Sequence, residues 1–119
     1  MGIFISNSFS INMLPSDSIV RIREIDIEKV KTLLLNNEFT SCIGHSTTAT
    51  VLSSLLNINV PSNRISIKLK EGDKLIVFQI MMRLEEGRIL TAEEIATLPF
   101  KFFLVEILPD YTIEALYHW

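Results

Sequence analysis

The chain has 119 residues, 48% of them apolar, and a formal net charge of −3 at pH 7. This length and apolar content suit one domain with a full hydrophobic core, so the fold needs no disulfide or metal to hold it together. The acidic balance argues against a protein that coats DNA or RNA broadly, because such proteins are basic.

The first part of the chain predicts two strands joined by a loop. Residues 2–6 form an apolar run that is typical of a strand. Residues 7–17 are rich in serine and asparagine, which is typical of a loop. Over residues 18–25 apolar side chains alternate with arginines, and this alternation predicts a half-buried strand.

A helix is predicted directly after the second strand. Asp26 is a favoured N-cap residue, and the apolar residues that follow it recur at helical spacing until Asn36. These apolar positions are Ile27, Val30, Leu33 and Leu34. Residues 39–43 then predict a third strand, and a second helix follows, for which Ser46 or Thr47 is the predicted N-cap.

Two further strands are predicted in the middle of the chain. Pro61 excludes any continuation of the second helix. Apolar and polar side chains alternate over residues 65–69, which predicts a strand with one face in water. Residues 71–73 (Glu-Gly-Asp) predict a turn, and the nearly continuous apolar run over residues 75–81 predicts a central strand. We therefore expect these two strands to form a β-hairpin, which makes the sheet mixed.

The last part of the chain predicts a loop, a short helix and a final strand. Residues 82–90 are polar and predict an exposed loop. Thr91 is expected to cap a helix over residues 92–98, and residues 100–108 predict the last strand. Residues 109–119 form a tail with three aromatic side chains. The alternation of strands and helices predicts an α/β fold, with one domain and a mixed β-sheet flanked by helices.

Four segments carry polar residues that a hydrophobic core does not explain. Three of them directly follow predicted strands, where open α/β sheets gather their ligands. Taken singly, each has a structural explanation, because asparagine and serine satisfy the backbone of turns and arginine commonly lies in solvent. The segments are 7–12 (Asn-Ser-Phe-Ser-Ile-Asn), 44–48 (Gly-His-Ser-Thr-Thr), 63–64 (Asn-Arg) and 83–88 (Arg-Leu-Glu-Glu-Gly-Arg).

His45 is the most informative residue of these segments. It lies between a predicted strand and a predicted helix, where unpaired backbone N–H groups and the helix dipole favour an anion. Imidazole can donate or accept a proton near neutral pH. A histidine at such a junction is also common as a cap or packing residue. Combined with the hydroxyl, amide, guanidinium and carboxylate groups of the other segments, however, it supplies what cleavage of an RNA phosphodiester needs.

In this order and spacing, the four segments resemble those of the small viral ring nucleases, which act as type III anti-CRISPR proteins and degrade cyclic tetra-adenylate. The segment 44–48 and the Arg-Leu-Glu-Glu-Gly segment at 83–87 carry most of the specificity. The resemblance covers roughly residues 3–108. It therefore predicts a ring nuclease domain at 1–108 and leaves the aromatic tail 109–119 without a counterpart.

The resemblance implies a homodimer of α/β subunits in archaeal viruses, with relatives in some bacteria. It implies a metal-independent reaction in which a ribose 2′-OH attacks the neighbouring phosphorus. It assigns His45 as general acid and Arg83 to the scissile phosphate, while Glu86 assists His45; the residues alone do not separate Glu86 from Glu85. The residues that it assigns to ligand binding are Asn7, Ser10, Gly44, Thr47 and Arg64.

The expected partners are cyclic tetra-adenylate and a second copy of the chain, with no cofactor, metal, membrane or double-stranded nucleic acid. No run approaches the roughly 18 apolar residues of a membrane span, and no signal peptide is visible. Cys42 is the single cysteine, which favours a reducing compartment, and we expect the host cell cytoplasm. Two alternatives stay open: a protein that only sequesters the cyclic nucleotide, and a structural or DNA-binding viral protein.

Overall fold

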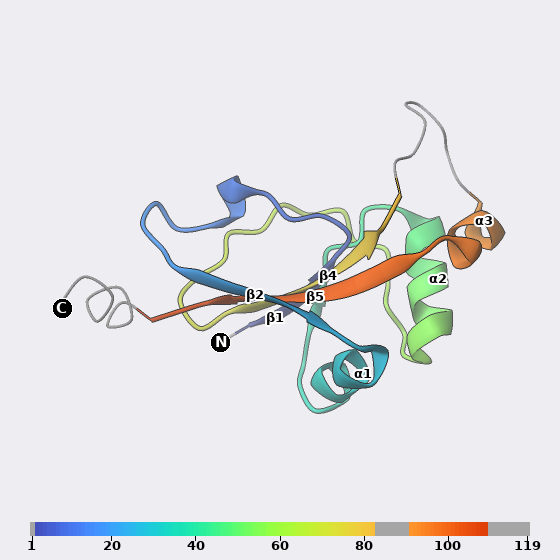
Figure 1. Cartoon of the computed structure of the whole chain (residues 1–119), viewed down its shortest axis with the longest axis horizontal. Helices are drawn as coiled ribbons and strands as arrows, with labels where there is room; N and C mark the ends of the chain where they lie inside the picture. Colours follow the sequence, from blue (N-terminus) through green and yellow to red (C-terminus); the bar gives the residue numbers. More distant parts are fainter. Residues whose placement is uncertain (1, 83–90, 110–119) are drawn as a thin grey trace.

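The computed structural model describes residues 2–82 and 91–109, which form a five-stranded sheet with helices beside it (Figure 1). The strands are β1 (Ile3–Ser6), β2 (Val20–Ile25), β3 (Thr40–Ser41), β4 (Lys74–Ile80) and β5 (Phe100–Ile107). They lie in the order β2-β5-β4-β1-β3. Strand β1 is parallel to β3 and β4, whereas β5 is antiparallel to β4 and β2. The predicted α/β fold with a mixed sheet is confirmed.

Local capping determines where two of the helices begin. The helices are α1 (Ile27–Leu35), α2 (Ser46–Leu56), α3 (Ala92–Thr97) and the short 3₁₀ helix η1 (Ile11–Met13). The Asp26 carboxylate accepts a hydrogen bond from the Lys29 N–H at 2.8 Å, as predicted for α1. At α3, the Thr91 hydroxyl accepts from the Glu94 N–H at 3.2 Å, and the Glu94 carboxylate accepts from the Thr91 N–H.

The sheet buries a hydrophobic cluster on each of its faces. Helices α1, α2 and α3 cover one face, and the buried centre of that cluster includes Ile5, Leu52, Ile76, Phe78 and Phe102. Loops cover the other face, where Phe9, Met13, Ile67 and Leu69 pack against Val77 and Val105. Figure 1 shows helix α1 and the loop before β2 on opposite sides of the sheet. The loop layer explains why residues 7–17 contain apolar side chains among their polar ones.

The hairpin predicted from residues 65–69 and 75–81 is wrong. Residues 63–70 form no strand, and the antiparallel neighbour of β4 is β5. The apolar side chains of Ile67 and Leu69 pack onto the loop-covered face, and the Leu69 N–H donates to the Met13 carbonyl at 2.7 Å. The segment therefore satisfies part of its backbone with the loop around η1. The turn at residues 71–73 is present, with Gly72 at a φ of 88° that favours glycine.

The two edge strands also differ from the prediction. Strand β3 contains only two residues of the predicted 39–43 run, and beyond it Ile43 forms an isolated parallel bridge with Ser62. Strand β2 is less buried than predicted, and Ile22 is 52% exposed. The reason is that β2 is the outermost strand and has a neighbouring strand only at β5.

Strands β1, β3 and β4 run in the same direction, so the segments that follow them emerge at one edge of the sheet. The sequence predicted this shared edge for three of its four polar segments. Among the described residues, no helix is long and apolar enough to cross a membrane.

Candidate functional site

A pocket of about 200 Å³ lies at the edge where β1 and β4 end, beside the first turn of α2. Its lining residues are Asn7, Thr48, Phe78, Gln79, Ile80 and Met82. Asn7 directly follows β1, and Thr48 is the third residue of α2. Parallel pairing of β1 with β4 brings these elements together. Two of the four predicted segments therefore line one pocket.

His45 is the N-cap residue of α2, so the prediction of Ser46 or Thr47 at this position is wrong. Its backbone is extended, with φ −122° and ψ 131°, and its carbonyl accepts from the Ala49 N–H at 3.0 Å. Ser46 already has helical backbone and cannot act as the cap. His45 is exposed, and its imidazole makes no hydrogen bond or ion pair with the residues that the structure describes. Within the described part of the chain, nothing holds this imidazole away from a ligand.

The first turn of α2 offers a binding site for an anion. Because the His45 side chain forms no capping hydrogen bond, the backbone N–H groups of Ser46, Thr47 and Thr48 have no acceptor from the N-cap residue. Such N–H groups, together with the helix dipole, favour a phosphate group. Thr48 is 6% exposed and lines the pocket, so the pocket touches the first turn of α2. Gly44, His45 and Arg64 are not among the lining residues.

Arg64 lies beside this helix end, although it follows a different segment of the chain. A Cβ placed on Gly44 would lie 3.6 Å from Cγ of Arg64. Asn63 fixes this arrangement, because its N–H donates to the Ile43 carbonyl and its Nδ2 donates to the Ser41 carbonyl, both at 2.8 Å. Asn63 is thus a structural residue, and its backbone position brings the exposed Arg64 next to the residue before His45.

Other predicted site residues are not gathered at the pocket. Ser10 is exposed at the start of η1, where its hydroxyl donates to Oδ1 of Asn12, and it does not line the pocket. Thr47 is half-buried in the first turn of α2 but is not a lining residue either. Arg83 and Glu86 lie outside the described residues, as do Glu85 and the tail from residue 110.

The structure adds five residues that sequence reasoning did not assign to the site: Thr48, Phe78, Gln79, Ile80 and Met82. The signal for Gln79 was present, because it is the one polar side chain in the predicted strand over residues 75–81. A polar residue at the end of a central parallel strand commonly faces a ligand site. The burial of Thr48 depends on how α2 packs, and no local pattern in the sequence reveals it.

The described residues indicate neither a cysteine nucleophile nor a metal site. Burial raises the pKa of the Cys42 thiol, so this residue is a poor thiolate nucleophile despite its closeness to His45 in sequence. Within residues 2–82 and 91–109, no three side chains of histidine, cysteine, aspartate or glutamate lie close enough together to hold a metal ion.

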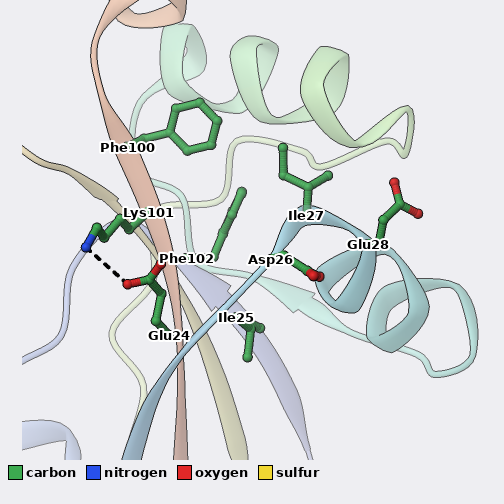
Figure 2. Close-up of a pocket in the computed structure, with 8 residues that line it drawn as sticks. All are labelled: Glu24, Ile25, Asp26, Ile27, Glu28, Phe100, Lys101 and Phe102. Atoms are coloured by element: carbon green, nitrogen blue, oxygen red, sulfur yellow. Dashed lines mark ion pairs between the residues drawn. The ribbon is translucent and has the colours of Figure 1, made fainter.

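A larger pocket, of about 380 Å³, lies between the end of β2, the start of α1 and the start of β5 (Figure 2). Its carboxylates are already engaged. Glu24 pairs with Lys101 at 3.1 Å, as the dashed line in Figure 2 shows, and Asp26 caps α1. None of the predicted site residues lines this pocket, and its acidic rim disfavours a phosphate ligand. The pocket beside α2 is therefore the candidate site.

Comparison with known proteins reveals relatives of similar size in archaeal viruses and in a bacterium. The protein called Uncharacterized protein 26 of Sulfolobus islandicus filamentous virus is 36% identical over 107 residues, which cover 88% of this chain and 91% of that protein. YddF of Bacillus subtilis is 27% identical over 95 residues, covering 78% of this chain and 88% of YddF. Relatives in archaeal viruses and in a bacterium are what the sequence resemblance predicted.

A solved structure shares the fold. B116 of Sulfolobus turreted icosahedral virus superimposes on this chain with a TM-score of 0.71 and 30% sequence identity. The matched region covers 89% of this chain and 99% of B116. The sequence pattern of the STIV B116-like family matches residues 3–102, a range that includes β1, α2, β4 and the candidate pocket. The chain therefore belongs to the STIV B116-like family, which occurs in archaeal viruses.

Proposed function

We propose that this protein is a ring nuclease that cleaves cyclic tetra-adenylate and thereby inhibits type III CRISPR defence. The observation that carries the proposal is the exposed His45 imidazole on the uncapped first turn of α2, beside the pocket at the strand ends. This arrangement pairs a proton donor with an anion site, and cleavage of a phosphodiester needs both. A family that occurs in archaeal viruses suits a protein directed against a host defence.

In the proposed reaction, a ribose 2′-OH attacks the neighbouring phosphorus and loses its proton to water. The bond between phosphorus and O5′ breaks, and protonated His45 donates a proton to the departing O5′. The product carries a 2′,3′-cyclic phosphate and a free 5′-OH. The N–H groups of the first turn of α2 donate hydrogen bonds to the non-bridging phosphate oxygens, where negative charge develops.

The remaining site residues would bind and orient the ring. Arg64, beside Gly44, offers a cation to a second phosphate, and the Asn7 amide in the pocket can hydrogen-bond to ribose or phosphate. Arg83 and Glu86 enter through the family resemblance alone, Arg83 at the scissile phosphate and Glu86 as the partner of His45.

The cleavage is expected to proceed at an unchanged rate in excess EDTA, because the substrate's own 2′-OH is the nucleophile and no metal-bound water takes part. Radiolabelled cyclic tetra-adenylate incubated with pure protein, with and without Mg²⁺, measures this rate. A ring of 2′-deoxyadenylates serves as the control and should bind but stay intact. Loss of cleavage in EDTA that Mg²⁺ restores contradicts the mechanism. A ribose ring that is bound but never cleaved would instead indicate a sequestering protein.

The active unit is proposed to be a two-fold dimer. Small-molecule pockets usually span about 300–1,000 Å³, so the pocket of about 200 Å³ on one protomer holds only part of a four-nucleotide ring. Two protomers related by a two-fold axis would present the same residues to opposite phosphates of the ring. Two copies of His45 would then cut the ring into two dinucleotides.

Mixing two inactive variants tests whether Glu86 acts across the dimer. We expect His45→Ala and Glu86→Ala proteins to regain part of their activity once subunits exchange, because one site of each heterodimer then contains both intact residues. Recovery is measured as cleavage of cyclic tetra-adenylate, and exchange is followed by mass spectrometry of the native dimer. If exchange is complete but activity stays low, Glu86 does not act on the partner's His45.

A further inference from the structure

Among the described residues, the outer edge of β2 has no neighbouring strand, and the strand is regular along its whole length. All six residues of β2 pair one to one with β5, from Val20 with Ile107 to Ile25 with Phe102, and this register has no bulge. The strand contains neither glycine nor proline. Natural edge strands are usually shortened, bulged, covered or charged, because their free N–H and C=O groups can pair with another strand. Of these devices, β2 carries charged side chains.

The opposite edge of the sheet is covered. Beside β3, the Ser41 hydroxyl donates to the Pro61 carbonyl at 2.6 Å, the Asn63 side chain donates to the Ser41 carbonyl, and Ile43 bridges to Ser62. The segment 61–63 therefore lies along that side. In the described part of the chain, β2 is the last strand on its side of the sheet.

One hydrogen bond shows which backbone groups of β2 point outward. The Leu108 N–H donates to the Ile19 carbonyl at 2.9 Å, so this pair continues the register as a hydrogen-bonded pair. Hydrogen-bonded and non-bonded pairs alternate along antiparallel strands. Residues 21, 23 and 25 therefore direct their N–H and C=O groups toward β5. Val20, Ile22 and Glu24 direct theirs away from the sheet.

The side chains of this edge are positively charged on one face of the sheet and include an exposed apolar residue on the other. Arg21 and Arg23 lie on the face of Glu106, whose Oε1 is 2.8 Å from Nη2 of Arg21 and 3.5 Å from Nη2 of Arg23. Lys74 lies 4.0 Å from Oε2 of the same carboxylate, so three cations share one anion. The two arginine side chains remain 54% and 48% exposed. Ile22, on the opposite face, is 52% exposed.

These arginines oppose pairing of the edge with a second copy of itself in the registers centred on the middle of the strand, at Arg21, Ile22 and Arg23. In a continuous two-fold sheet, antiparallel copies pair residues that lie on the same face. Centring the pair on Ile22 places Arg21 opposite Arg23, and centring it on Arg23 places that residue opposite its own copy. Like charges directly opposite each other are unfavourable. The same excess of positive charge favours an acidic strand.

We infer that the outer edge of β2 binds an extended segment of a partner protein by strand addition, with acidic side chains facing Arg21 and Arg23 and an apolar side chain facing Ile22. The outward N–H and C=O groups of Val20, Ile22 and Glu24 supply the main-chain hydrogen bonds. This partner surface lies at the strand edge of the sheet and requires none of the residues of the candidate pocket.

Binding of a probe peptide tests the inference. A short fluorescein-labelled peptide that alternates glutamate with valine is titrated with the whole protein, and fluorescence polarisation measures binding. We expect it to bind at least about tenfold more tightly than the same peptide with lysine in place of glutamate. A version N-methylated at alternate amides should not bind. Equal binding of the lysine peptide, binding of the N-methylated peptide, or no binding at millimolar concentration overturns the inference.

Three variants locate the binding at the edge. Ile22→Pro removes an outward N–H and leaves the hydrogen bonds to β5, so it should fold, as checked by thermal unfolding, and lose peptide binding. Arg23→Ser should weaken binding of the glutamate peptide by up to about fivefold. Lys29→Ser changes the net charge equally at an exposed site on α1 and should leave binding unchanged. An equal loss in Lys29→Ser, or full binding by folded Ile22→Pro, contradicts the assigned surface.

Discussion

His45→Ala is expected to lower the single-turnover rate of cyclic tetra-adenylate cleavage by about 10²- to 10⁴-fold, the usual contribution of a general acid. In the proposed mechanism His45 supplies the proton to the leaving O5′, and without it that oxygen departs as an unprotonated alkoxide. Binding should persist, because the N–H groups of the first turn of α2 and the guanidinium of Arg64 remain in place.

The variant should also fold normally. The His45 side chain makes no capping hydrogen bond, so its removal takes no bond from α2. The matched control is His118→Ala, which removes the other histidine of the chain and should cleave at the unaltered rate. Calorimetric titration with the uncleavable deoxy ring measures binding separately from chemistry. A near-normal cleavage rate for His45→Ala would falsify its assignment as the acid.

Asp73→Ala is expected to lower the free energy of unfolding by about 2–5 kcal/mol, because two backbone N–H groups lose a buried charged acceptor. The Asp73 side chain accepts from the Gly2 N–H and from the Lys70 N–H, each at 2.8 Å, and the residue is 3% exposed. These bonds tie the start of β1 to the turn before β4. Urea unfolding followed by circular dichroism measures the loss.

A matched variant separates this effect from the loss of a charge. Asp17→Ala removes the same charge from an exposed loop position and should change the unfolding free energy by less than about 0.5 kcal/mol. Asp73→Asn, which keeps one carbonyl acceptor, should fall between the two. An unfolding free energy for Asp73→Ala as high as that of Asp17→Ala would show that water replaces the carboxylate at no cost.

The sequence predicted the elements whose signals are local. Asp26 and Thr91 lie within three residues of the N–H groups that they cap, so α1 and α3 begin where they were expected. The prediction for residues 65–69 failed because their alternation is compatible with any extended segment that has one buried face. Their partner, the loop around Met13, is distant in sequence. The contact between Gly2 and Asp73 spans 71 positions and has no local signal either.

The part of the candidate site that lies directly after strands could be predicted from the sequence. Asn7 and His45 follow β1 and β3, and the parallel pairing of these strands places both segments at one edge. The identity of the N-cap was missed by one residue, because serine and threonine are better caps than histidine and the local pattern favoured them. The hydrogen bonds of Asn63 place Arg64 beside Gly44, and only the folded chain reveals them.

The end groups of the reaction product test the central proposal most directly. Mass spectrometry of cyclic tetra-adenylate after incubation with the protein in EDTA should show linear di-adenylate that ends in a 2′,3′-cyclic phosphate and a 5′-OH, because the 2′-OH attacks and O5′ leaves. If the ring is recovered intact after saturating binding, or if the products carry a 5′-phosphate, this protein is not a ring nuclease that uses the 2′-OH.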